Sequence, residues 1–365
     1  SGALIPDGAG GFYSTCQKGS DNGAGVIARI AADGTTTQVY RFDRHTRGVP
    51  GGPAMPLGAP VLGPDGKLYG WTTYGGANTC TLGGDLQTAG CVFVLDPATG
   101  LLEVLHSFES YESPWNADNS PLQSVLLASD GNLYGTHQHA GANGSGIVWR
   151  LELPSRAFTV LHTFGPRNAT AVPRFKNDDG ALPLGTLVED RYGFLYGTCS
   201  MGGDFGHGTI FQLSRDGAQF VTLHSLGYGA GGHHPHAGVV IVGSQGFGTC
   251  FAGGDSVDAN GQGGFGTVFA FTLPNTVHGK VGVEPGVMVE SDPIRVGCVT
   301  APTVKATAPA EYSVNGGMWM SAVGAIAPGD ELRIRAMSST TTGKRVLAGY
   351  SIGFQSGSFA ITTRT

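Results

Sequence analysis

The segment Leu195-Tyr196-Gly197-Thr198-Cys199 decides the fold, because the chain repeats its pattern. The same Leu-Tyr-Gly phrase begins at Leu68 and at Leu133, and weaker versions occur at Phe12-Tyr13-Ser14 and Gly246-Phe247-Gly248. Each copy precedes a glycine-rich turn and a second apolar run, which predicts paired antiparallel strands. Five copies of a short unit that cannot bury its own apolar face predict a protein built from packed repeats.

The repeats define the expected architecture. We place them at about 1–48, 56–110, 121–167, 182–227 and 236–280, with four short strands in each. Such units predict an all-β fold, a five-bladed β-propeller over residues 1–280, since radial packing protects strand edges. Most repeats close with an aliphatic-His-aromatic phrase that contains His106, His162 or His224. Because a repeated histidine is more often a packing residue than a catalytic one, we expect a structural role.

Composition limits the possible functions. Glycine contributes 62 of the 365 residues and charged residues only 13%, which favours turn-rich β structure over long helices. The net charge of −6 and the lack of a basic stripe argue against a nucleic-acid partner. No apolar run has the length of a membrane span. The start at Ser1 without a methionine, with six cysteines in the chain, predicts a mature secreted or cell-surface protein.

The repeat phrases carry a family resemblance. Leu133-Tyr134-Gly135-Thr136, a Gly-Gly turn, a Gly-Thr-aliphatic-Phe strand and Leu105-His106-Ser107-Phe108 resemble the bacterial GloVer tandem repeat of choice-of-anchor exported proteins. The resemblance covers about residues 1–280 and implies surface-anchored propeller blades without a catalytic signature. Repeat one departs from the pattern with Ser14 in place of glycine, and repeat five lacks a closing phrase after Phe271-Thr272-Leu273.

Residues 281–365 have a different pattern. Alternating runs such as Glu331–Arg335 predict strands, and Asn315-Gly316 predicts a hairpin turn. The phrase Tyr312–Gly317, followed by Pro328-Gly329-Asp330, resembles a small immunoglobulin-like module of bacterial exoproteins, which implies a β-sandwich accessory domain. We therefore expect two domains, 1–280 and 281–365, and consider the C-terminal strand a candidate for pairing with a neighbouring subunit in a homo-oligomer or fibre.

The cysteines predict disulfides. Cys80 and Cys91 bracket an insertion in repeat two, and a disulfide at its base is expected in an oxidising compartment. When the second strands of the five repeats are aligned, one position, here called the column, is occupied in turn by Cys16, Thr72, His137, Cys199 and Cys250. One interpretation pairs Cys250 with Cys199 or Cys16, and the remaining thiol with Cys298. The alternative is a soft metal, zinc or copper, bound by the column on the propeller axis.

Two further segments are candidates for metal binding. Gly232-His233-His234-Pro235-His236 is the densest imidazole cluster, and His233, His234 and His236 are candidate ligands, joined by His207 or His278. The alternative is a histidine-rich surface loop. The segment Asp255–Gly261 places oxygen ligands at short intervals and is a weak candidate for Ca²⁺, because it lacks EF-hand spacing.

Aromatic and acidic residues suggest two kinds of ligand site. Trp71, Trp115 and Asp118 are candidate ligand-binding residues, since aromatic faces beside polar groups suit sugar rings. Loop carboxylates at the rim of a funnel suggest a glycoside hydrolase or lyase; they are Asp118, Asp178, Asp179, Asp204, Asp255 and Asp258. The sequence favours a non-catalytic protein that recognises a glycan or a surface protein, or assembles into a surface layer or fibre. The alternatives are a glycosidase or lyase and an extracellular metal-binding protein.

Overall fold

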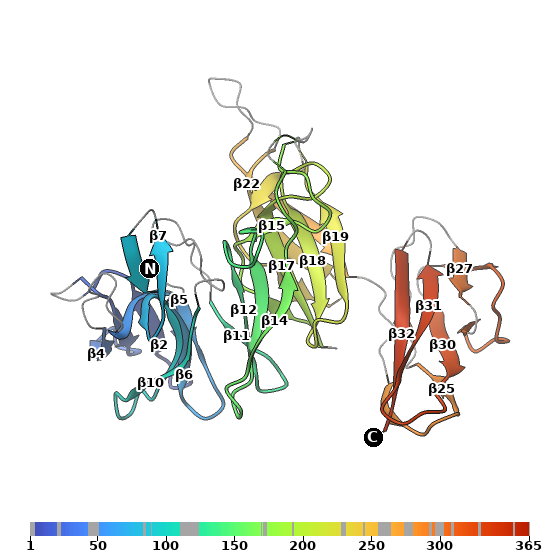
Figure 1. The fold of residues 1–365 in the computed structure, drawn as a ribbon, viewed down its shortest axis with the longest axis horizontal. Coiled ribbons are helices and arrows are strands. Elements are labelled where there is room, and N and C mark those ends of the chain that lie inside the picture. Colours follow the sequence, from blue (N-terminus) through green and yellow to red (C-terminus); the bar gives the residue numbers. More distant parts are fainter. Residues whose placement is uncertain are drawn as a thin grey trace. The chain divides into compact units, whose positions relative to one another are not determined.

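The structure, a computed structural model, is all-β in the residues that it describes (Figure 1). These residues are 4–19, 23–42, 51–82, 85–88, 90–109, 124–168, 170, 174–191, 193–227, 231–243, 245–254, 264–273, 280–291, 294–295, 303–307, 310–327, 330–352 and 355–364. In this part of the chain no helix is long and apolar enough to cross a membrane. Two compact units form, one from Ser1–Ile241 with Phe247–Ala270 and one from Val242–Gly246 with Phe271–Thr365. The second unit thus takes in residues before the expected boundary at 281.

Five sheets follow one another along the chain up to residue 272. Sheet 1 contains β1 (Ile5–Pro6), β2 (Phe12–Cys16), β3 (Val26–Ile30) and β4 (Thr36–Arg41). Sheet 2 contains β5 (Gly51–Leu62), β6 (Leu68–Gly76), β9 (Cys91–Leu95) and β10 (Leu102–Ser107). Sheet 3 contains β11 (Leu126–Leu127), β12 (Leu133–His137), β13 (Ile147–Leu151) and β14 (Phe158–Thr163). Sheet 4 contains β15 (Ala181–Pro183), β16 (Val188–Glu189), β17 (Phe194–Met201), β18 (Thr209–Ser214) and β19 (Phe220–Ser225); sheet 5 contains β20 (His233–Pro235), β21 (Val240–Val242), β22 (Gln245–Ala252) and β23 (Thr267–Thr272). The insertion in sheet 2 forms a hairpin of β7 (Thr79–Leu82) and β8 (Asp85–Thr88).

A hydrogen bond explains the tyrosine of the repeated Leu-Tyr-Gly phrase. In three sheets the tyrosine hydroxyl donates to the aspartate of the preceding turn: Tyr69 to Asp65 at 2.9 Å, Tyr134 to Asp130 at 2.7 Å and Tyr196 to Asp190 at 3.0 Å. Burial, followed by this bond, raises the pKa of Tyr69 to about 12. The phrase therefore closes each hairpin with a buried tyrosine whose hydroxyl is satisfied.

Close packing across strands explains the glycine of the same phrase. A Cβ atom built on Gly197 would lie 2.4 Å from Cζ of Phe211, which is paired with it on β18. The same clash, at 2.3 to 2.6 Å, would occur in three other sheets at Gly70 with Phe93, Gly135 with Trp149 and Gly248 with Phe269. In sheet 1 the residue paired with Ser14 is Ala28. The departure of repeat one is therefore compensated within its own sheet, because a small partner makes room for the serine.

Neighbouring sheets pack face to face through apolar clusters. One cluster joins sheets 1 and 2, a second joins sheets 2 and 3, and a third joins sheets 3 and 4. The repeated histidines lie beside these interfaces. His106 stacks on Phe158 of the next sheet, with centroids 4.2 Å apart, and His162 stacks on Phe220 at 3.7 Å. The predicted packing role is confirmed for these two histidines.

A second repeated contact, here called the proline joint, links the first strand of one sheet to the preceding sheet. The residue before a proline donates its backbone N–H to a carbonyl of the preceding sheet: Met55 to Ala24 at 2.8 Å, Leu182 to Ser145 at 2.7 Å and His234 to His207 at 2.9 Å. These three donors have φ values of 55°, 55° and 54°. The joint thus holds a strained residue at three places in the chain, between sheets 1 and 2, 3 and 4, and 4 and 5.

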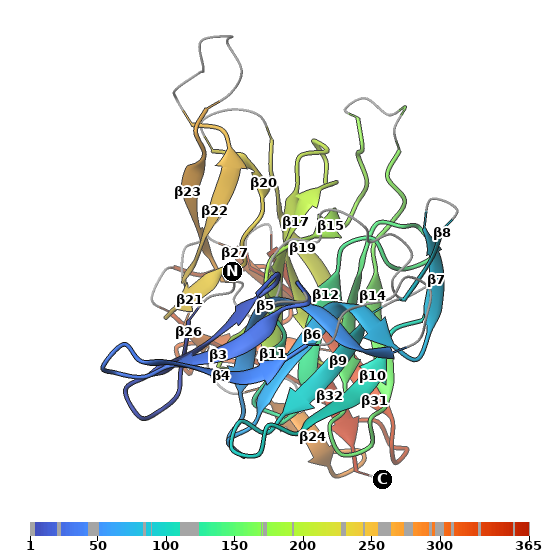
Figure 2. The same ribbon diagram turned by 90° about the vertical axis from the view of Figure 1, so that its left-hand side faces the viewer.

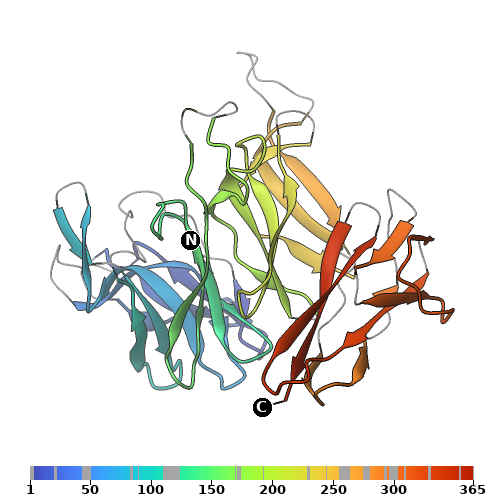
Figure 3. The same ribbon diagram turned by 45° about the vertical axis from the view of Figure 1, so that its right-hand side comes forward.

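The second unit has two sheets around one apolar core (Figure 3). One sheet contains β24 (Lys280–Val283), β27 (Thr303–Ala306), β29 (Gly324–Ala325), β31 (Arg345–Ile352) and β32 (Gln355–Thr363); the other contains β25 (Met288–Glu290), β26 (Ile294–Arg295), β28 (Glu311–Val314) and β30 (Glu331–Met337). The predicted turn at Asn315-Gly316 is confirmed, since both residues have positive φ values, 51° and 71°. Strand β32 pairs with β31 on one side and β24 on the other. The pairing with β24 involves only Ile361 and Thr363, whereas β31 pairs with residues from Gln355 to Thr362, so the pairing of this strand with a neighbouring subunit stays a prediction.

Candidate metal centre

Three histidines meet at the proline joint between sheets 4 and 5. His207 lies in the loop before β18, whereas His233 and His234 lie on β20. One ligand nitrogen from each of the three side chains lies within 4.8 Å of the other two. The ring centroids are 4.8 to 5.4 Å apart. Three imidazoles at this spacing are a possible ligand set for one metal ion.

Hydrogen bonding orients one of these rings. Nδ1 of His234 lies 2.7 Å from the carbonyl oxygen of Ser200. Because a carbonyl can only accept, Nδ1 carries the proton, and the lone pair of the neutral ring is on Nε2. A ligating histidine usually donates its other nitrogen to a backbone carbonyl or carboxylate in this way, which fixes the tautomer and the ring orientation.

Burial favours the neutral form of two of these rings. Desolvation lowers the pKa of His207 and of His233 below the ordinary value of 6.5, and the neighbouring His234 lowers both further. Neutral imidazoles expose the lone pair that a metal needs, so protons do not compete for these nitrogens at neutral pH. Imidazole suits zinc, copper, nickel and iron, and three histidine ligands leave a fourth coordination position open.

The joint itself does not require histidine. The positions of His207, His233 and His234 correspond to Ala24, Ala54 and Met55 at the joint between sheets 1 and 2, and to Ser145, Ala181 and Leu182 at the joint between sheets 3 and 4. All three joints make the same backbone bond with the same strained residue before proline. The packing role is therefore met by small or aliphatic residues elsewhere. The replacement of all three positions by histidine at one joint indicates a function beyond packing.

The ligand set differs from the sequence prediction at one position. His236 is exposed, and its ring stacks on Phe251 with centroids 4.9 Å apart, outside the three-histidine cluster. It lies two positions after His234, with Pro235 between them. The prediction of His236 as a ligand is therefore wrong, and His207 takes its place. His278 and the Ca²⁺ candidate Asp255–Gly261 lie outside the described residues.

The predicted disulfides are not formed by the described cysteines. Cys16, Cys91, Cys199 and Cys250 are free thiols, and Cys298 and the side chain of Cys80 lie outside the description. Three of these thiols contact threonine hydroxyls of their own sheets, and not another cysteine. The sulfur of Cys91 lies 3.3 Å from the Thr72 hydroxyl on the adjacent strand; Cys199 bonds in the same way with Thr209, and Cys250 with Thr267. Burial raises the pKa of Cys91 to about 11 and also raises those of Cys199 and Cys250, which makes these thiols unreactive.

The column of aligned residues also fails as a metal site. Cys199 belongs to the apolar cluster between sheets 3 and 4. His137 lies against Trp71 and Phe108, so it packs between sheets 2 and 3. His137 and Cys199 are thus buried in different interfaces, and Cys16 is exposed, so these described members of the column do not converge on one ion.

Trp71 is a core residue. Only 7% of it is exposed, and it packs edge-on against Phe108 and His137. The prediction that Trp71 stacks on a sugar is wrong, because the indole face is covered by the neighbouring sheet. Trp115 and Asp118 lie outside the described residues, so their assignment to a ligand site stays a prediction.

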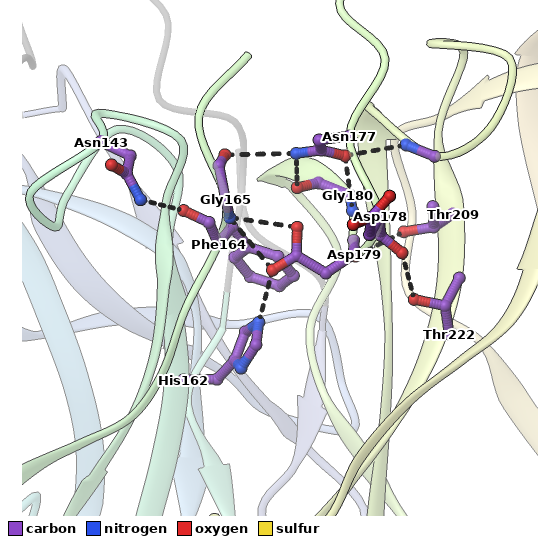
Figure 4. Close-up of polar contacts among 11 residues, drawn as sticks. Asn143, His162, Phe164, Gly165, Asn177, Asp178, Asp179, Gly180, Thr209 and Thr222 are labelled. Atoms are coloured by element: carbon purple, nitrogen blue, oxygen red, sulfur yellow. Dashed lines mark hydrogen bonds and ion pairs between the residues drawn. The ribbon is translucent and has the colours of Figure 1, made fainter. Parts of the chain in front are cut away.

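A polar cluster beside sheets 3 and 4 accounts for one of the candidate carboxylates (Figure 4). Asp179 accepts hydrogen bonds from the backbone N–H of Gly165 and from Nε2 of His162, each at 3.0 Å. Asn177 bonds to Gly165 and to Gly180 in the same network, at 3.2 and 2.7 Å. These contacts anchor the segment that leads into sheet 4. Asp179 is therefore a structural residue of the connection between the two sheets.

Comparisons with known proteins found distant structural matches over most of the chain and one family model that matches its first 174 residues. TolB from Acinetobacter baumannii matches with 14% identity and a TM-score of 0.41, over 92% of this chain and 66% of that one. A protein of unknown function from Dyadobacter fermentans matches with 10% identity and a TM-score of 0.42, over 92% and 93% of the two chains. An exo-β-1,3-galactanase from Phanerochaete chrysosporium matches with 11% identity and a TM-score of 0.38, over 93% and 92%. The search of curated proteins found no match. Residues 1–174 match the family described as the Gloeobacter/Verrucomicrobia repeat, which supports the repeat family recognised in the sequence.

Proposed function

We propose that this chain is an exported, non-catalytic binding protein whose His207, His233 and His234 bind one transition-metal ion. The observation that carries the proposal is the change of three joint positions from small or aliphatic residues to histidine between sheets 4 and 5. The low charge of the chain and the repeat family of its first half support export. The five successive sheets support an arrangement of propeller-type blades, and the two-sheet second unit supports an immunoglobulin-like accessory module.

Zinc and copper are the metals that this donor set favours. All three donors are imidazole nitrogens, which suit both ions, and none is a thiolate or a carboxylate. One ligand comes from the loop before β18 and two come from β20. A bound ion would therefore cross-link sheets 4 and 5 while its fourth position stays open to a ligand from outside. Such a centre fits a protein that acts by binding.

The test is metal binding by protein purified without a histidine tag and stripped with EDTA. Isothermal titration with Zn²⁺ and with Cu²⁺, with elemental analysis of the complex, should give one tightly bound ion per chain. The matched variant H207S/H233A/H234L copies the residues of the joint between sheets 3 and 4, so it should fold. Its affinity should fall by more than roughly 100-fold, as loss of metal ligands requires.

A control variant separates this site from the neighbouring imidazole. His236→Ala removes an exposed histidine outside the cluster and should leave affinity and stoichiometry unchanged. Absence of stoichiometric binding by the native chain, or unchanged binding by the triple variant, would refute the proposal. If His236→Ala alone abolished metal binding, the metal site would include His236 and would not be the cluster at the joint.

A further inference from the structure

We propose that the outer face of sheet 5 docks head-to-tail on the outer face of sheet 1 in a second copy of this chain. One position recurs in all five sheets, the second residue of the strand that follows the glycine-rich turn; these strands are β3, β9, β13, β18 and β23. In sheets 1 to 4 this residue is 0 to 1% exposed: Ile27, Val92, Val148 and Ile210. Its counterpart in sheet 5, Val268, is 78% exposed.

The buried counterparts show which face this position occupies. Val148 of sheet 3 belongs to the same apolar cluster as Leu195 and Phe211 of sheet 4. Val92 of sheet 2 likewise clusters with Leu133 and Trp149 of sheet 3. The position therefore faces the following sheet. Within the described residues of the first unit no sheet comes after sheet 5, in agreement with the exposure of Val268.

Two more apolar residues lie on this face of sheet 5, whose strands β22 and β23 run side by side in Figure 2. Phe251 follows the buried Cys250 on β22, so it points to the opposite face, and it is 70% exposed. Val240 follows the buried Val239 and is 62% exposed. Three strands thus contribute large apolar side chains to one open face, the kind of surface that marks an interaction site.

Sheet 1 has the complementary surface. In sheets 2, 3 and 4 the residue before the repeated tyrosine is buried against the preceding sheet and is 0% exposed: Leu68, Leu133 and Leu195. The equivalent residue of sheet 1 is Phe12, which is 38% exposed, and Cys16 on the same face of β2 is also exposed. This is the face that receives the preceding sheet in sheets 2, 3 and 4.

The occupant follows from this complementarity. The chain already makes the same sheet-to-sheet contact three times, and each contact joins the face found open on sheet 5 to the face found open on sheet 1. In a second copy of the chain, the exposed face of sheet 1 can cover the exposed face of sheet 5. The reverse contact is available to a further copy, and both contacts are apolar like those within the chain. The contact is heterologous, so it produces a closed ring of chains if the rotation closes and a filament if it does not.

Light scattering and sedimentation over a range of concentrations, in EDTA so that metal plays no part, test this inference. The native chain should self-associate as concentration rises. Val268→Lys and Phe12→Glu should each be monomeric, because each destroys one of the two faces. Mixed in equal amounts they should form a heterodimer, since V268K retains the sheet 1 face and F12E retains the sheet 5 face.

Control experiments test whether the loss of association is specific to the two faces and whether each variant folds. Leu101→Lys changes an apolar residue that is 72% exposed in a turn of sheet 2, and it should associate like the native chain. Circular dichroism confirms folding, and Phe251→Lys replaces V268K if that variant misfolds. Self-association of F12E alone would indicate pairing between two sheet 5 faces and would overturn the proposal. The proposal would also be overturned if the native chain stayed monomeric while V268K and F12E lost only thermal stability. That result would indicate that sheets 5 and 1 contact each other within one chain.

Discussion

At the residue scale, the repeat is explained by pairs of residues that face each other across strands. Gly197 has a negative φ, so its role is to leave room for the ring of Phe211. Ser14 with Ala28 shows the alternative solution, in which the partner is small. The Leu-Tyr-Gly phrase predicted where strands would form. It did not predict why glycine is needed, because the ring that fills the space belongs to another strand.

This pairing predicts a coupled stability effect. Gly197→Ala should lower the free energy of unfolding by about 1–3 kcal/mol, since its Cβ would overlap Phe211. In a chain that already carries Phe211→Ala, the same glycine substitution should cost less, and the remaining cost comes from Cδ2 of Leu187, which would lie 2.9 Å from the new Cβ. Urea unfolding of the four chains of this double-mutant cycle measures the coupling.

The matched control for the cycle is Gly231→Ala, because a Cβ at that position would contact nothing within 4 Å. Its effect should stay within about 0.5 kcal/mol. An equal cost of Gly197→Ala with and without the ring of Phe211 would contradict the packing explanation.

At the element scale, the proline joint is the unit on which the proposed metal site depends. The sequence pointed to the histidine cluster around β20, and it named His207 as a further candidate ligand. It could not rank His207 above His236, because the joint brings the loop before β18 to β20 across two sheets. The same limit explains the errors on disulfides: Cys199 and Cys250 occupy equivalent places in adjacent sheets, but each thiol bonds to a threonine in its own sheet.

The joint predicts a pH effect on metal-free protein. The pKa values of His207 and His233 lie below 6.5 in the folded chain, whereas unfolded histidine titrates near 6.5. The unfolded chain therefore binds more protons as the pH falls below 6.5, and folded stability decreases there. Between pH 7.5 and 5.5 the urea midpoint of the native chain should drop more than that of H207S/H233A/H234L. Equal drops for the two proteins would show that the cluster is not buried as described.

At the scale of the whole molecule, the sequence predicted the all-β class and the repeated units correctly. It expected four strands in every repeat, but in sheet 5 the first strand is divided into β20 and β21, and β23 pairs only with β22 in the described residues. Trp71 shows a second limit. A tryptophan in place of threonine looked like a ligand contact, but its environment depends on a sheet whose sequence begins more than fifty residues later.

A crystal structure of the zinc-loaded protein would show whether one joint of the repeated scaffold is a metal centre. Anomalous diffraction recorded on both sides of the zinc edge locates the ion without reference to the protein coordinates. We expect one strong peak bonded to nitrogens of His207, His233 and His234, at about 2.0–2.1 Å from each. A peak at His236 or elsewhere on the surface, with the three joint histidines unligated, would contradict it.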